Sequence, residues 1–247
     1  MSRRLPKPGS IRNVVTGRSD GYTGRVPFAR LGVTCAYESL LSGDFLLQTS
    51  AYEADVVRID SEPFRLRLLI DGEETLWTPD YRIVRASGSR EVIEVKPVEE
   101  IHPERARIQI GDQVELTKRM RKAAERFAAM RRAATEVGYT FRLVSEDEIR
   151  IQPRLANAAL ILRYAGEQFP PSWLMQARLA LAGEAIFSVD GLQTFLPPHV
   201  DAFPLALHLA WAGEVELDPT RPFTRESRFV RIGYRLLDST LARKVTA

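Results

Sequence analysis

The chain has 247 residues, of which 45% are hydrophobic and 27% charged, and a formal net charge of +3. This composition is that of a soluble globular protein with a real apolar core, in one large domain or two small ones. No run of eighteen apolar residues occurs, and the basic N-terminus lacks the apolar stretch of a secretory signal, so we expect neither a membrane span nor secretion. The single cysteine, Cys35, excludes an internal disulfide framework and a Cys-rich zinc site, and its apolar surroundings favour a buried structural thiol over a nucleophile.

The N-terminal 34 residues hold seven basic side chains and one acidic side chain, and are rich in glycine and proline. Such a segment is poorly ordered alone and suits a phosphate backbone. We expect a basic N-terminal arm over residues 1–34, with Arg12, Arg18 and Arg25 as candidate DNA contacts. A solubilising tail is the alternative.

The ordered body is predicted to begin with a helix over residues 36–52, with Thr34 as its N-cap and Glu38 in its first turn. Three strand-like runs follow, at 55–59, 64–70 and 75–84. Asp71-Gly72 between the last two is a strong turn pattern.

The segment from Thr78 to Lys96 carries the most informative pattern. Its two apolar runs, 81–84 and 92–95, flank the turn residues Ser87-Gly88-Ser89, which predicts a hairpin. Asp80 precedes the first run, while Glu94 and Lys96 share one face of the second. Closure of the hairpin would bring these three side chains together, in the P-D…E-x-K arrangement of restriction-endonuclease-like nucleases.

Two carboxylates at this separation offer the hard oxygen ligands that Mg²⁺ prefers, with the rest of the shell left to water and phosphate. A neighbouring lysine can steady a phosphate or orient a water molecule. The alternative is structural, because Glu-x-Lys is common on exposed strands and Pro-Asp is an ordinary entry to a turn.

A helix is predicted over residues 115–137, ended by Gly138, because apolar residues recur at steps of three and four. Its basic residues lie largely off this apolar stripe. They form either a solvated face or a DNA-contacting face, for which Lys118, Arg119 and Lys122 are the candidates. With a return strand at 139–144, these elements make an α/β core of nuclease size over residues 35–150.

From residue 151 to 247 the pattern changes to short helices, expected at 154–165, at 171–182, near Ile186 and at 199–211. Residues 215–217 and 228–232 would form a small two-stranded wing. We therefore expect a mainly helical, winged-helix-like second domain that binds DNA or protein.

Several segments together resemble the TnsA endonuclease subunits of heteromeric, Tn-seven-like transposases. The resemblance covers about the first 165 residues. The segments that carry it are 21–27 (Gly-Tyr-Thr-Gly-Arg-Val-Pro), 37–46, 54–58, 62–64, 77–81 (Trp-Thr-Pro-Asp-Tyr), 94–97 (Glu-Val-Lys-Pro) and 144–150. Ser42-Gly43 and Ser61-Glu62 depart from residues common in the family, without touching the candidate catalytic residues.

The resemblance implies a restriction-endonuclease-like nuclease domain, made of a mixed sheet flanked by helices. It assigns catalysis to Glu38, Asp80, Glu94 and Lys96, and Mg²⁺ binding (with Mn²⁺ able to substitute) to Asp80, Glu94, the Val95 carbonyl and Glu38. It implies cleavage of the 5′ strands of double-stranded DNA at transposon ends by a bacterial cytoplasmic protein. The implied partners are a TnsB-like DDE transposase and a TnsC-like ATPase, the latter bound through the C-terminal domain.

Two other functions remain open. A stand-alone nuclease of repair or anti-phage defence would use the same residues. The other alternative is a catalytically inactive DNA- or protein-binding scaffold, and the presence of all four candidate catalytic residues argues against it. A nucleotide or redox enzyme is disfavoured, because no Gly-rich phosphate loop or cofactor motif follows any strand.

Overall fold

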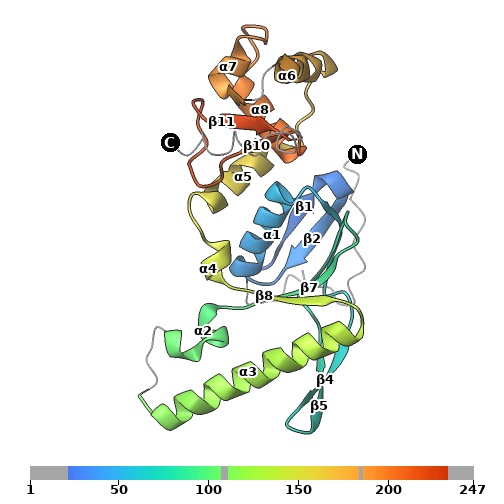
Figure 1. Cartoon of the computed structure of the whole chain (residues 1–247), viewed down its shortest axis with the longest axis vertical. Coiled ribbons are helices and arrows are strands. Elements are labelled where there is room, and N and C mark those ends of the chain that lie inside the picture. Colours follow the sequence, from blue (N-terminus) through green and yellow to red (C-terminus); the bar gives the residue numbers. More distant parts are fainter. Residues whose placement is uncertain (1–21, 107–110, 184–185, 233–247) are drawn as a thin grey trace. The chain divides into compact units, whose positions relative to one another are not determined.

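The computed structural model of the chain describes residues 22–106, 111–183 and 186–232, and the fold divides into two compact units, Met1–Ile151 and Gln152–Ala247 (Figure 1). The candidate arm residues Arg12 and Arg18 lie outside the described residues. Among the described residues, no helix is long and apolar enough to cross a membrane.

A mixed four-stranded sheet forms the centre of the first unit. Its strand order is β3-β6-β7-β8, in which β8 is parallel to β7 and the other pairs are antiparallel. The predicted hairpin is confirmed as β6–β7, with Tyr81 opposite Ile93 and Gly88 at φ +85° in the turn. The strands are β3 (Val56–Ser61), β6 (Tyr81–Arg85), β7 (Arg90–Val95) and β8 (Thr140–Val144).

Helices cover both faces of this sheet, as expected for the nuclease core. On one face, helix α3 (Gln113–Glu136) packs against the sheet and against a separate hairpin, β4–β5 (Leu66–Ile70 and Glu73–Trp77). On the other face lies α1 (Leu40–Tyr52). The ring of its Phe45 stacks on the ring of Tyr81, with the ring centroids 5.5 Å apart. The buried cluster on the α3 side consists of Leu68, Trp77, Val92, Ala129, Met130, Ala133, Ala134 and Phe141.

The predicted strand at 75–84 is wrong as a single element. Thr78, Pro79 and Asp80 separate β5 from β6, and the two strands belong to different sheets. Proline cannot donate to a ladder, so the chain leaves one sheet here and enters the next. The predicted turn at Asp71-Gly72 is confirmed, with φ values of +52° and +82°.

The N-terminal region differs from the prediction in two ways. The described end of the expected arm forms a hairpin of β1 (Gly24–Phe28) and β2 (Val33–Tyr37), because alternate residues such as Val26 and Phe28 are buried. Helix α1 therefore begins four residues later than predicted. Its N-cap is Ser39, which accepts from the Ser42 amide, and not Thr34.

Short elements complete the first unit. The helices α2 and η2 lie between β7 and α3, and α4 follows β8. The N-cap of α3 is Asp112. Gly138, at φ +79°, ends α3 as predicted. The short elements are the 3-10 helices η1 (Ala29–Leu31) and η2 (Pro103–Arg105) and the helices α2 (Val98–Ile101) and α4 (Glu146–Ile149).

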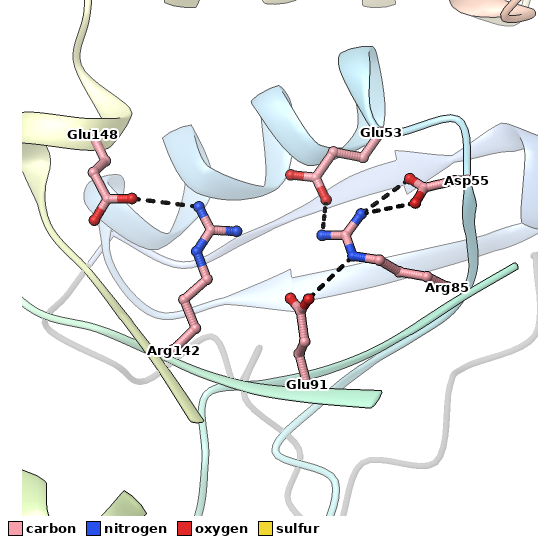
Figure 2. Close-up of polar contacts among 6 residues, drawn as sticks. All are labelled: Glu53, Asp55, Arg85, Glu91, Arg142 and Glu148. Carbon is pink, nitrogen blue, oxygen red and sulfur yellow. Dashed lines mark hydrogen bonds and ion pairs between the residues drawn. The ribbon is translucent and has the colours of Figure 1, made fainter. Parts of the chain in front are cut away.

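Ion pairs at the turn end of the β6–β7 hairpin fasten the sheet to its surroundings (Figure 2). The Arg85 guanidinium donates to Glu53 at 2.7 Å, to Asp55 at 3.0 Å and to Glu91 at 3.2 Å. We call these four residues the Arg85 cluster. They join the loop after α1 and the strands β6 and β7. Arg142 on β8 pairs separately with Glu148 of α4 at 3.4 Å.

Over residues 152–183 and 186–232, the second unit contains four helices and a three-stranded antiparallel sheet in the order β10-β11-β9. The predicted pairing of residues 215–217 with 228–232 is confirmed as β10–β11, although the sheet has a third strand. The helix expected near Ile186 is wrong, because residues 186–188 pair with β11 as a third strand. The elements are α5 (Arg154–Ala165), α6 (Pro171–Gly183), β9 (Ile186–Ser188), α7 (Val189–Gln193), α8 (Ala202–Trp211), β10 (Val215–Leu217) and β11 (Arg228–Arg231).

Candidate active site

Asp80, Glu94 and Lys96 meet at the open end of the β6–β7 hairpin, opposite its turn. Asp80 directly precedes β6 and is held from both neighbouring strands. Its carbonyl accepts the Glu62 amide at 2.9 Å, and its Oδ2 accepts the Val95 amide at 2.7 Å. The convergence predicted from the hairpin register is therefore present.

Glu94 is buried, with only 2% of its surface exposed. Its Oε1 lies 3.1 Å from the Lys96 Nζ, and its Oε2 accepts a hydrogen bond of 2.9 Å from the Trp77 indole N–H. Both side chains of an ordinary Glu-x-Lys pair on an exposed strand would be solvated. The burial of Glu94 does not fit that alternative.

The site concentrates negative charge away from water. Burial, followed by the charge of Glu94, raises the pKa of Asp80 to about 7, against the opposing effects of Lys96 and the Val95 amide. Burial lowers the pKa of Lys96, but the attraction of Asp80 and Glu94 outweighs this, so the Lys96 pKa lies above its ordinary value. Lys96 is therefore a fixed positive charge at neutral pH.

Glu38 lies outside this group of three. It precedes the N-cap of α1 on the link from β2, and not in the first helical turn as predicted, and its side chain is exposed. It is near enough to Tyr81 to contribute, behind burial and the charges of Cys35 and Asp80, to raising the pKa of that phenol. Within the described ranges, no three His, Cys, Asp or Glu side chains are gathered closely enough to hold a metal ion.

The donor chemistry nevertheless fits a divalent cation held by two carboxylates. Asp80 and Glu94 supply hard oxygen ligands, and the charge of Glu94, which adds to burial in raising the pKa of Asp80, is one that a cation would compensate. Mg²⁺ commonly keeps several waters and takes only one or two protein carboxylates. Binding by the Val95 carbonyl and by Glu38 stays a prediction.

Two residues near the site were missed by sequence reasoning. Trp77 reaches Glu94 from the end of the β4–β5 hairpin. Glu146 of α4 accepts the Val98 amide at 2.6 Å, just beyond Lys96, whose own amide donates to the Val144 carbonyl at 3.0 Å. Both contacts are tertiary, and the sequence near the site contains no pattern that predicts them.

The candidate DNA-contacting residues that the structure describes are exposed. Arg25 projects from β1, and Lys118, Arg119 and Lys122 lie on α3, where Arg119 pairs with Glu115 at 2.8 Å. In this fully described helix no residue before Ala129 is buried, so its N-terminal half is a largely solvated rod.

Residues 53–146 match the family model described as the TnsA-like endonuclease N terminal domain. This segment is similar to a TnsA-like endonuclease domain. The resemblance seen in the sequence is thereby confirmed, and the matched TnsA-like segment contains Trp77, Asp80, Glu94 and Lys96, whereas Glu38 precedes it. No curated protein shows significant similarity to the chain.

Proposed function

We propose that the chain is a metal-dependent DNA endonuclease of a Tn-seven-like transposition system, which hydrolyses the 5′ strands at transposon ends. The observation that carries this proposal is the cluster of Asp80, Glu94 and Lys96 inside the segment that matches the TnsA-like endonuclease domain. The three side chains sit at one end of a rigid hairpin, where their charges can act on one phosphate.

Each residue of the site has a distinct role in this proposal. Asp80 and Glu94, with the Val95 carbonyl and Glu38, hold Mg²⁺, for which Mn²⁺ can substitute. A bound divalent ion would acidify a water molecule and neutralise charge that develops on the phosphate. The Lys96 ammonium, fixed 3.1 Å from Glu94, would bind a non-bridging phosphate oxygen or hold the attacking water in line.

The DNA duplex is proposed to lie along exposed basic residues of the first unit. Lys118, Arg119 and Lys122 project from the solvated half of α3, and Arg25 from β1. The basic arm, with Arg12 and Arg18, would add further phosphate contacts. Contacts of this kind supply affinity without sequence preference and weaken with salt.

The partners are proposed to be a TnsB-like DDE transposase, which would act on the 3′ ends, and a TnsC-like ATPase bound by the second unit. We propose that this unit is winged-helix-like. The pair of helices α7 and α8 followed by the β10–β11 hairpin, with β9 as a third strand, supports that assignment.

A plasmid-cleavage assay tests the proposal. Supercoiled DNA carrying the transposon ends is incubated with Mg²⁺ or Mn²⁺, with and without the neighbouring transposase. We expect nicks at the 5′ strands that require the transposase, the metal and Lys96, and that Glu73→Gln, an exposed substitution on the β4–β5 hairpin, leaves unchanged. Cutting of any DNA by this chain alone would instead identify a stand-alone nuclease, and the absence of cutting in every condition would reject the proposal.

A further inference from the structure

We propose that Trp77 is a positioning residue of the metal site, which orients Glu94 through its indole N–H and thereby sets the affinity for the divalent cation. This inference rests on the proposed function, because it takes Asp80 and Glu94 as the metal-binding carboxylates. Neither the sequence motif nor the match to the family model assigns this role to Trp77.

Each of the two carboxylate oxygens of Glu94 contacts a different side chain. Oε2 accepts from the Trp77 Nε1 at 2.9 Å, and Oε1 faces the Lys96 Nζ at 3.1 Å. Each carboxylate oxygen has two acceptor sites, so each contact leaves one for a metal ion. The indole can only donate, and its fixed ring restricts rotation of the carboxylate plane.

Trp77 can act as a fixed donor because it is itself immobilised. Its side chain is 5% exposed and meets Phe141 of β8 edge to face, with ring centroids 5.7 Å apart and an interplanar angle of 77°. Leu68 from the same hairpin and Met130 from α3 complete the apolar cluster around it. Movement of the indole would require repacking of this cluster, which the close packing of a protein core resists.

The chain places this donor and a proposed metal ligand in one short segment. Trp77 ends β5, and Asp80 follows after Thr78 and Pro79, at the start of β6. At one end of this segment the Trp77 indole donates a hydrogen bond to Glu94, and at the other end the Asp80 carboxylate lies near Glu94. Buried ligands of metals are commonly oriented by such hydrogen bonds, whose loss weakens metal binding about 10–100-fold.

The first test measures Mn²⁺ affinity of the full chain without DNA, by calorimetry and by electron paramagnetic resonance. Trp77→Phe keeps an aromatic ring in the cluster and removes the N–H donor. We expect it to bind Mn²⁺ about 10–100-fold more weakly. The matched control is Phe127→Leu on α3, a partly buried residue that packs against the same cluster, and this variant should bind Mn²⁺ as the unaltered protein does. Unchanged affinity in a folded Trp77→Phe variant would overturn the inference.

A double-mutant cycle separates a role through Glu94 from a general loss of packing. If Trp77 acts through Glu94, then adding Trp77→Phe to Glu94→Ala, which removes the acceptor of the indole hydrogen bond, costs no further Mn²⁺ affinity. Equal losses in both backgrounds would show that the indole acts by another route and would overturn the inference.

A third measurement leaves Trp77 in place, so it does not depend on the folding of a Trp77 variant. The chain has three tryptophans, and Trp173→Phe with Trp211→Phe leaves Trp77 as the only tryptophan, which is excited selectively over the tyrosines. We expect its fluorescence to change saturably with Mg²⁺, and Asp80→Ala to abolish the change. Saturable Mg²⁺ binding seen by calorimetry with no change in emission would contradict the role of Trp77. Absence of any metal binding by the unaltered chain would instead remove the proposed function on which the inference rests.

Discussion

The two ends of the β6–β7 hairpin both place a basic side chain among carboxylates, and the difference between them separates a structural network from a candidate site. At the turn end, Arg85 directs separate donors to Glu53, Asp55 and Glu91, and part of that cluster is open to water, with the Asp55 side chain 53% exposed (Figure 2). At the open end, the single ammonium of Lys96 pairs with Glu94, whose side chain is only 3% exposed, and is also attracted by Asp80.

Geometry and solvation explain this contrast. A guanidinium is planar, stays charged and satisfies several carboxylates at once, which suits a permanent clamp. At the open end one ammonium faces two carboxylates, and desolvation, followed by the charge of Glu94, raises the pKa of Asp80 in spite of Lys96. The Arg85 cluster therefore joins separate parts of the fold, whereas the excess of carboxylates over ammonium groups at the open end supports the proposal of a cation there.

The largest expected effect is a loss of DNA cleavage when the open end of the β6–β7 hairpin is altered. Lys96→Ala should lower DNA cleavage by about 100–1000-fold or more, because it removes a positioned cation from the reacting phosphate. Its melting temperature should fall, because buried Glu94 loses its ion-pair partner, but the variant should remain folded at the temperature of the assay. Plasmid nicking rates and circular dichroism melts check this. Cleavage at normal rates by Lys96→Ala would remove the lysine from the site.

Arg85→Ala should show the opposite behaviour. It leaves Glu53 and Glu91 without their partner, and we expect a loss of about 2 kcal/mol in the free energy of unfolding, less than for a fully buried pair because the cluster is partly solvated. Urea denaturation measures the loss. Below the melting temperature, nicking should continue, and a variant that is stable but inactive would place Arg85 in the catalytic machinery instead.

The charge imbalance at the open end predicts a pH-dependent stability of the metal-free protein. The pKa of Asp80 is raised in the folded state, so its contribution to stability is fully present below its unfolded pKa of about 3.8 and is lost as the pH rises through about 7. Asp80→Asn should therefore stabilise the metal-free protein at pH 8, by a free energy on the order of 2 kcal/mol. Melting temperatures at pH 5 and pH 8, with and without Mg²⁺, test this. Equal destabilisation of the variant at both pH values would contradict it.

The smallest effect concerns the backbone beyond Lys96. Glu146→Ala removes the carboxylate that accepts the Val98 amide at 2.6 Å, and should lower stability by about 1 kcal/mol, as for the loss of a helix cap. We expect nicking to slow modestly, because the backbone after Lys96 gains freedom. Glu148→Ala, on the same short helix, is the control, and an equal effect from both variants would deny Glu146 a specific role.

What the sequence predicted well was local. Alternation around Gly88 predicted the β6–β7 hairpin, and its register brought Asp80 to Glu94. The apolar stripe and the terminal Gly138 predicted α3 because helix periodicity and a left-handed stop are read within one segment.

The failures arose where distant segments decide the structure. Val26 and Phe28 alternate within a basic, glycine-rich stretch, and only packing against α1 makes them a strand. Ile186–Ser188 becomes a strand because β11 offers an edge. The burial of Glu94 and its bond to Trp77 depend on how the β4–β5 hairpin folds over the sheet, and no spacing in the sequence reports that.

The position of Trp77 also has a consequence for the order of folding. Asp80 and Glu94 are close in the chain, so closing one hairpin brings them together, an event of microseconds in isolated hairpins. The indole is fixed only when α3 and β8, much later in the chain, pack around it. We therefore expect the two carboxylates to meet early, while the orientation of Glu94 is among the last features that the folding domain acquires.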